Sequence, residues 1–199
     1  MADFNKIYSG DKNAWGMEVS PILINALKYI KRGLVLDIGC GQGKETIYLA
    51  NKGFDVVALD SSSVAIDQIK EIIKKNKLKN IRAVNSDIID FEIKKNAYDL
   101  ILCFNVLYFL EKSTARRIVK KIQEGMKKGG IIAMSLFTVH DTFYNEQKKH
   151  RFYVETNEVR GLFENFEILD YFEGIINEPR HASYPDPHTH GVVKIVAKN

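Results

Sequence analysis

A glycine-rich turn behind a short apolar run is the first stretch of the sequence with the residue types of a ligand site. Val35–Ile38 is apolar apart from Asp37, and Gly39, Gly41 and Gly43 follow at alternate positions. Glycine permits positive φ and lets the backbone approach a ligand closely. The spacing differs from the GxGxxG of dinucleotide-binding turns, and a carboxylate beneath the turn repels phosphate and attracts a cation. The turn therefore predicts a ligand whose nearest group is an ammonium or another cation.

Two more aspartates follow at the ends of strand-like runs. Asp60 ends DVVALD and Asp87 ends IRAVNSD, with Ile88 next. Ligands of open α/β sheets bind at the carboxyl ends of the strands, where Asp60 can accept hydrogen bonds from a ribose diol. Asp87 can accept an exocyclic amine proton while Ile88 packs on a flat base. Each aspartate alone could instead cap a helix or open a turn. Three on consecutive strand ends indicate a ligand with a cationic amino-acid tail, a ribose and an adenine, which is S-adenosylmethionine.

The elements that must position these acids alternate between strand-like and helix-like segments. We expect strands at 34–38, 55–60, 81–87, 98–105, 131–139, 166–174 and 192–199. We expect helices that begin at Pro21 behind Ser20, at Lys44, behind Ser61–Ser63, behind Ser113 and near Thr156, with Gly33 and Gly53 ending the first two. Five apolar runs alternating with helices predict an α/β fold with a parallel sheet covered on both faces. The last two strands have no helix between them and are expected to be antiparallel.

Composition limits the class of protein and its partners. With 199 residues and a net charge of +4, the chain is most simply one domain. Within it we expect an N-terminal arm over 1–20, a cofactor-binding core over 21–139, and a substrate-side insert, helix and antiparallel strands over 140–199. The lysine-rich segment 70–80 is interpreted as a solvated helix face, so no nucleic acid is expected as a partner.

The N-terminus, the apolar stretches and the cysteines predict the cellular location and oligomeric state of the protein. The first 15 residues have no apolar core for a signal peptide, and the apolar stretches are too short to span a membrane. Cys40 and Cys103 cannot build a disulfide framework or a zinc site on their own. We expect a cytoplasmic monomer or homodimer with no membrane partner.

Five motifs together resemble the class I S-adenosylmethionine-dependent methyltransferases over about residues 20 to 140. They are VLDIGCGQG, VVALD, NSDI, YDLILCFNVLYFL and MKKGG, in that order and spacing. The resemblance implies a Rossmann-like, seven-stranded, mostly parallel sheet with an antiparallel last strand and helices on both faces. It also implies that Asp37 and the glycines hold the methionine end, Asp60 the ribose, and Asp87 with Ile88 the adenine. The full set expected to bind the cofactor is Asp37, Gly39, Cys40, Gly41, Gly43, Asp60, Ser61, Asp87, Ile88, Phe104, Asn105 and Trp15.

A finer pattern looks like the small-molecule and tellurite-resistance methyltransferases. GKETIYLANKGFDVVALDSSSVAID and YVETNEVRGLFENFEILDYFEG are similar to runs of that branch. Glu45-Thr46 departs from its usual Asn-Ala, and Asn157–Val159 from its Gly-Glu-Leu. The resemblance implies an enzyme that transfers a methyl group to a small acceptor such as a thiol, a chalcogen oxyanion or another small metabolite. The alternatives are a methylase of protein or nucleic-acid side chains, and a non-catalytic module that binds S-adenosylmethionine.

Four residues are candidates for catalysis on the acceptor side. Methyl transfer needs a general base only if the acceptor is protonated at neutral pH. Tyr108 is a polar member of an apolar run at a strand end, and packing alone is its alternative role. His188 and His190 face the same way on an extended chain, and His181 precedes them. A base, a metal site and an unreactive surface loop stay open for the histidines, and no metal is assigned.

Aromatic residues in the N-terminal segment are expected to cover the site. Phe4, Tyr8 and Trp15 lie among polar residues. In the branch that the sequence resembles, this segment forms a lid, and its rings would exclude water and favour a sulfonium by cation–π attraction. Ordinary docking of an N-terminal arm is the alternative.

Overall fold

A seven-stranded sheet runs through the chain. The computed structural model describes residues 3–11, 13–16, 18–145, 148–178 and 186–199. The strands are β1 Leu34–Ile38, β2 Asp55–Asp60, β3 Ile81–Asn85, β4 Tyr98–Phe104, β5 Met126–Phe137, β6 Glu167–Glu178 and β7 His188–Lys198. Their order is β3-β2-β1-β4-β5-β7-β6, and β7 is antiparallel to both of its neighbours. The predicted mostly parallel sheet with an antiparallel last strand is confirmed.

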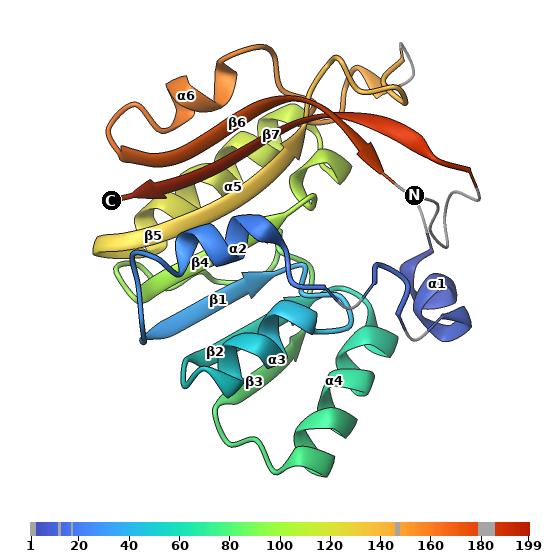
Figure 1. Cartoon of the computed structure of the whole chain (residues 1–199), viewed down its shortest axis with the longest axis vertical. Coiled ribbons are helices and arrows are strands. Elements are labelled where there is room, and N and C mark those ends of the chain that lie inside the picture. The colour runs from blue at the N-terminus through green and yellow to red at the C-terminus, as the bar shows by residue number, and fades with distance from the viewer. Residues whose placement is uncertain (1–2, 12, 17, 146–147, 179–185) are drawn as a thin grey trace.

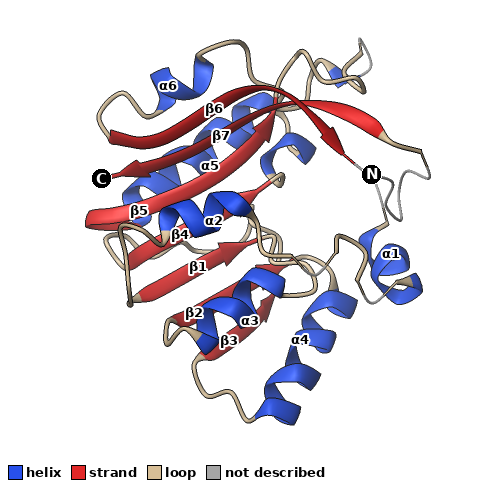
Figure 2. Cartoon of the chain, in the orientation of Figure 1, coloured by secondary structure: helices blue, strands red, loops and turns tan. Residues whose placement is uncertain are grey.

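Helices cover both faces of this sheet (Figures 1 and 2). They are α1 Phe4–Gly10, α2 Pro21–Ala26, α3 Lys44–Asn51, α4 Ser63–Asn76, α5 Lys112–Gly125, α6 Glu158–Leu162 and the 3-10 helix η1 Leu107–Phe109. No helix among the described residues has the length and apolar character needed to cross a membrane.

Side chains of each strand point alternately to the two faces of the sheet, which explains why helices cover both faces. In β1, Val35 belongs to the hydrophobic cluster that includes residues of α2 and α3, whereas Leu36 belongs to the cluster that includes residues of α5 and α6. Ile101 and Leu102 of β4 divide between the same two clusters. Successive side chains of a strand point to opposite faces, so a strand that is apolar throughout needs a cover on each side.

The sheet order also fixes where a ligand would bind. The strand order reverses between β1, which β2 and β3 follow on one side, and β4, which lies on the other. Loops leave in opposite directions at such a reversal, and the crevice between them lies at the carboxyl ends of the strands. Figure 1 shows α1 on the side to which the arrowheads of β1 and β4 point.

Several element boundaries differ from the predicted ones. The helix expected behind Ser113 begins at Lys112 with Glu111 as its N-cap, because Glu111 is held extended by a bridge to Arg151. The helix expected to end at Gly33 ends at Ala26. Helix α1 was not predicted, whereas the cap of α4 was, since Ser62 Oγ accepts from the backbone N–H three residues on.

Candidate functional site

The glycine turn after β1 is packed too closely for side chains. Gly39 has φ 69° and Gly41 φ 51°. A Cβ on Gly39 would overlap Val106, and one on Gly41 would lie 3.0 Å from the Tyr8 hydroxyl. The backbone N–H of Gly39 donates to the Leu59 carbonyl at 2.8 Å, which ties the turn to β2. Positive φ and close packing therefore require glycine at these positions, as the sequence predicted, beside the reversal point of the sheet.

Asp37 lies buried beneath this turn. Its side chain accepts a 2.6 Å hydrogen bond from the Thr46 hydroxyl. Burial, and next the charge of Glu45, raise the pKa of Asp37 to about 7, while the Thr46 hydrogen bond opposes the rise. A carboxyl group in this state is stabilised as its anion by a cation placed beside it. Asp37 therefore suits the ammonium end of an amino-acid ligand.

Asp60 is the last residue of β2 and lies beside the glycine turn. Its Oδ2 accepts from the Gly41 N–H and its Oδ1 from the Ser62 N–H, each at 2.8 Å. Burial raises the pKa of Asp60, and these backbone N–H groups oppose the rise. A carboxylate offers about four acceptor positions, so two hydrogen bonds leave capacity for a diol. The residues present thus fit the amino-acid and ribose parts of S-adenosylmethionine.

The third acid lies at the turn behind β3. The carboxylate of Asp87 accepts from the Ile89 N–H at 2.9 Å, and the side chain is exposed. Ile88 is buried. Asp87 therefore also performs the turn-opening role that the sequence left open, while its exposed carboxylate leaves an adenine contact available. Ser61 is exposed, and its carbonyl accepts from Asn85 at 3.0 Å.

The end of β4 lies beside β1 at the same edge of the sheet. Phe104 is half-buried, and Asn105 follows it with a left-handed φ of 55°. The Asn105 N–H donates to the Ser135 carbonyl, and its side-chain oxygen accepts from the Ser135 hydroxyl at 2.9 Å. Neighbouring β5 thus holds Asn105 at the carboxyl edge. Cys40, also predicted for the cofactor, is buried against α4.

The N-terminal arm docks onto the glycine turn. The Tyr8 hydroxyl accepts a 3.4 Å hydrogen bond from the indole of Trp15, whose side chain is 40% exposed. Burial, and next the charge of Asp60, raise the pKa of Tyr8 to about 12, so the hydroxyl stays protonated. Gln42 in the turn accepts from the Ala14 N–H at 3.0 Å. The arm therefore contacts the turn through hydrogen bonds at Gln42, whose side chain also donates to the Asp11 carbonyl at 2.8 Å.

The acceptor-side candidates are joined by a chain of rings. The Tyr108 ring lies 4.8 Å from that of Phe137, which lies 4.7 Å from the His190 ring. His190 and His188 belong to β7 rather than to a surface loop, so the surface-loop interpretation was wrong for these two. His181 lies outside the described residues.

Several polar residues of the site were missed from the sequence. Thr46 and Glu45 were noted only as departures from a family pattern, yet both are buried beside Asp37. Asp141 bonds to His190 across 49 positions of the chain. Of these residues, only Glu45 and Thr46 could have been found from the sequence, because they are polar residues at the start of a helix behind the glycine turn.

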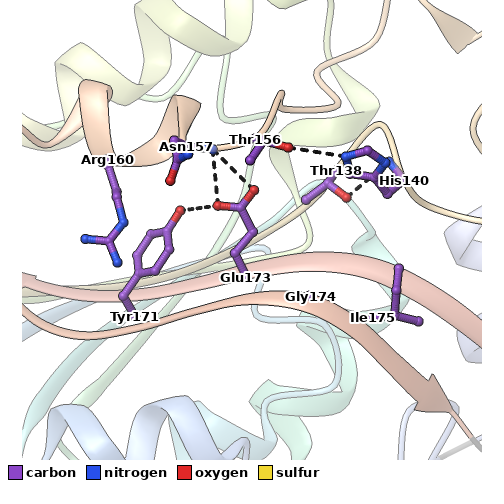
Figure 3. A pocket seen from close by; sticks show the side chains of 9 residues that line it. All are labelled: Thr138, His140, Thr156, Asn157, Arg160, Tyr171, Glu173, Gly174 and Ile175. Carbon is purple, nitrogen blue, oxygen red and sulfur yellow. Dashed lines mark hydrogen bonds between the residues drawn. The ribbon is translucent and has the colours of Figure 1, made fainter.

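A groove is lined by residues of α6 and β6 and by residues that follow β5 (Figure 3). Its volume is about 520 Å³, and it is lined by Thr138, His140, Thr156, Asn157, Arg160, Tyr171, Glu173, Gly174 and Ile175. Within it the Glu173 carboxylate accepts from the Tyr171 hydroxyl at 2.5 Å and from the Asn157 N–H at 3.2 Å. Arg160 lies over the Tyr171 ring. These groups bond to one another, and the lining contains no predicted site residue, so the groove is not the candidate site.

The strand order, the single antiparallel strand in the described sheet, and the acids at the ends of β1 and β2 and just after β3 define a class I methyltransferase fold. Comparison with known sequences narrows the class. A family model described as "Tellurite resistance protein TehB" matches residues 6–182, and the chain belongs to this family. The predicted resemblance is confirmed, and the predicted cofactor is confirmed at the level of the family.

Named relatives agree with this assignment. The "Probable S-adenosyl-L-methionine-dependent methyltransferase TehB" of Haemophilus influenzae (strain 10810) is 32% identical over 157 residues, which are 77% of this chain and 52% of that protein. A "Carboxy-S-adenosyl-L-methionine synthase" of Yersinia enterocolitica is 26% identical over 70% of this chain and 58% of that protein. The chain thus spans about half the length of the curated relatives it matches.

Solved structures show the same fold. The crystal structure of TehB from Haemophilus influenzae superposes with a TM-score of 0.81 at 25% identity, covering 98% of this chain and 67% of that one. A Burkholderia thailandensis 1,6-didemethyltoxoflavin-N1-methyltransferase, solved with S-adenosylhomocysteine, has a TM-score of 0.71 at 18% identity, with 99% and 85% coverage. The second likeness concerns the fold alone.

Proposed function

We propose that this chain is an S-adenosylmethionine-dependent methyltransferase that acts on a small-molecule acceptor. The observation that carries the proposal is the glycine turn held between buried Asp37 and Asp60, in a chain of the TehB family. An anion beneath bare backbone suits a cationic amino-acid tail and disfavours a pyrophosphate. The name of the family favours a chalcogen oxyanion as acceptor, with thiols as the next candidates.

We assign one set of residues to the cofactor and another to the methyl acceptor. Asp37 binds the ammonium group, Asp60 the ribose diol, and Asp87 with Ile88 the adenine. When bound, S-adenosylmethionine supplies a methyl group on a sulfonium, which an acceptor atom takes by in-line displacement. The protein's own work is to align the acceptor and exclude water. Tyr8 and Trp15 of the arm and the rings around Tyr108 would exclude water from the two sides.

The remaining predicted contacts extend the cofactor site. Gly39, Gly41 and Gly43 present backbone to the methionine end, and Ser61, Phe104 and Asn105 line the crevice. We place the protein in the cytoplasm, since Cys40 and Cys103 are free and buried. His188 and His190 line the acceptor side.

Labelled methyl transfer tests the proposal. The full chain is given S-adenosylmethionine with a labelled methyl group and one of four acceptor classes, namely chalcogen oxyanions, thiols, amines and carboxylates. We expect turnover with one class and tight cofactor binding by calorimetry. Tight binding without turnover on any class would support a cofactor-binding module instead, and absence of binding would refute the cofactor site itself.

A further inference from the structure

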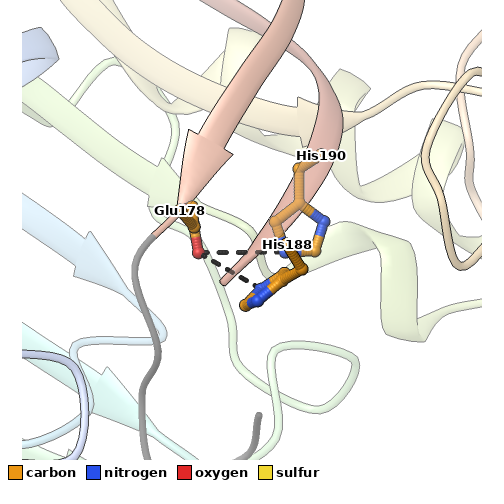
Figure 4. A group of neighbouring side chains, drawn as sticks. All are labelled: Glu178, His188 and His190. Carbon is orange, nitrogen blue, oxygen red and sulfur yellow. Dashed lines mark ion pairs between the residues drawn. The ribbon is translucent and has the colours of Figure 1, made fainter. Parts of the chain in front are cut away.

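The end of the β6–β7 hairpin brings together three side chains with the donor atoms of a transition-metal site. Glu178 is the last residue of β6 and pairs with His188 of β7, and His190 is two residues further along. The Glu178 Oε2 atom lies 3.9 Å from His188 Nε2 and 3.8 Å from His190 Nε2 (Figure 4). One donor atom from each of the three residues lies within 4.8 Å of the others.

The two Glu178–histidine distances are longer than direct hydrogen bonds and are close to the spacing of ligand atoms around one metal ion. Protein hydrogen bonds between nitrogen and oxygen span about 2.7–3.2 Å. A tetrahedral zinc ion with bonds of about 2.0–2.2 Å holds its ligand atoms about 3.4 Å apart. Each Glu178–histidine pair therefore needs to close by about half an ångström. The widest separation among the three donor atoms, up to 4.8 Å, needs to close by up to about 1.4 Å, which side-chain rotation can supply.

His190 is oriented as a metal ligand by a buried carboxylate. Its Nδ1 lies 2.6 Å from Asp141 Oδ2, and the Asp141 side chain is buried. The other Asp141 oxygen accepts from the Phe143 N–H at 2.8 Å. A carboxylate acceptor assigns the ring proton to Nδ1, which leaves the Nε2 lone pair toward Glu178 and His188. Histidine ligands of metals are held in this way.

We propose that Glu178, His188 and His190 bind a divalent transition-metal ion, with Zn²⁺ as the ion that fits best, and that Asp141 orients His190. Two imidazoles and one carboxylate favour zinc over magnesium or calcium, which prefer oxygen ligands alone. Three protein ligands are the number found in catalytic zinc sites, where a fourth position takes water or a substrate. The Phe143 ring, 5.6 Å from His188 and 5.4 Å from His190, supplies an apolar wall.

The position of the ion gives it a part in holding the acceptor. His190 contacts Phe137, which contacts Tyr108 in η1, and Val106 beside η1 packs against Gly39 of the cofactor turn. An ion here would hold an anionic oxygen, sulfur or heavier chalcogen donor in its fourth position. This last step rests on the proposed methyltransferase function, whereas metal binding itself does not.

Zinc binding by the purified full chain tests the site. The chain is stripped with a chelator and titrated with ZnCl₂ alone by calorimetry, with bound metal counted by mass spectrometry. We expect one ion per chain, and affinity about 100-fold weaker in His188→Ala, His190→Ala and Glu178→Gln. Asp141→Asn should weaken it by about 10- to 100-fold. His150→Ala is the matched control, because His150 also lies near a carboxylate, 3.8 Å from Glu111, but outside this cluster.

Two results would overturn the proposal. The first is a wild-type chain that binds less than one ion, and the second is a loss in His150→Ala equal to that in His190→Ala. Glu178→Gln keeps the side-chain shape, so normal circular dichroism with lost zinc binding excludes misfolding. Failure of the proposed function is read separately, as absence of methyl transfer by the zinc-loaded chain. If methyl transfer occurs with the same acceptor KM with and without zinc, the acceptor-holding role is wrong.

Discussion

The proposed cofactor half and the proposed acceptor half of the site are built by different means. In the cofactor half, Asp37 and Asp60 belong to neighbouring strands, and their partners are backbone N–H groups and one nearby hydroxyl. In the acceptor half, His190 meets Asp141 from across the chain, and rings from four segments fill the space. The first half is local and fixed by the sheet, whereas the second depends on how distant segments pack. The halves should therefore fail in different ways.

The largest effect is expected from Asp60→Asn. The amide keeps the shape but loses charge-assisted hydrogen bonds of about 1.5–3 kcal/mol each to the ribose diol. Cofactor affinity should fall about 100-fold by calorimetry. Asp67→Asn is the matched control, since Asp67 is an exposed aspartate on α4 paired with Lys70. A loss below threefold in Asp60→Asn would remove Asp60 from the cofactor half.

The pH dependence tests Asp37. Because its pKa is raised to about 7, a cationic ligand should bind best once the carboxyl is ionised, so affinity should rise about tenfold between pH 6 and pH 8. Stability has the opposite sign, since the stability supplied by the protonated carboxyl is present at low pH and is lost as the pH rises through about 7. Asp37→Asn should flatten both profiles. Calorimetry and thermal melts at several pH values measure them, and an unchanged slope in the variant would exclude Asp37 as their source.

The third prediction concerns the acceptor half. Phe143→Ala removes the ring beside His188 and His190. Turnover should fall about fivefold, or about 1 kcal/mol in transition-state stabilisation, with cofactor affinity unchanged. Steady-state kinetics and calorimetry on the same preparation provide the comparison. An equal loss in both measurements would mean that the two halves are not separable.

Two variants of Tyr8 test whether the N-terminal arm covers the proposed cofactor half. Tyr8→Ala removes the ring above Gly41, whereas Tyr8→Phe removes only the hydroxyl that Trp15 donates to. Cofactor should dissociate about threefold faster from the alanine variant and at nearly the wild-type rate from the phenylalanine variant. Stopped-flow displacement measures these rates. Equal cofactor dissociation rates in the wild type and both variants would mean that the arm docks on the protein without covering the cofactor.

The smallest effect is expected from Thr46→Val. The variant loses the hydrogen bond to Asp37, which is worth about 1 kcal/mol, and the Asp37 pKa should rise further. At pH 8 the melting temperature should fall by about 2–4 °C. Because a buried carboxylate is the cause, the loss should be smaller at pH 5. A loss that does not change with pH would point to packing alone.

The fold could be predicted because its signals are local. Alternating apolar strands and helices give the layers, and the antiparallel last pair was expected because the sequence between 174 and 192 shows no helical pattern. Acids at the ends of β1 and β2 were predictable for the same reason. The Glu111 cap was not, because a bridge to Arg151 decides it. The Asp141–His190 and Glu178–His188 pairs were not either, since sheet register and chain crossing place them together.

The position of β7 has a consequence for biosynthesis. Although β7 is the last strand along the described chain, it lies between β5 and β6, and each of these pairs with β7 in the described sheet. While a ribosome is still making residues 188–198, β5 has an open edge and β6 has not gained its partner. Open strand edges recruit other chains, and pairing across long sequence distances is slow. Nascent chains should therefore depend on chaperones until β7 emerges, and translational stalling before residue 188 should yield aggregation rather than a partly folded protein.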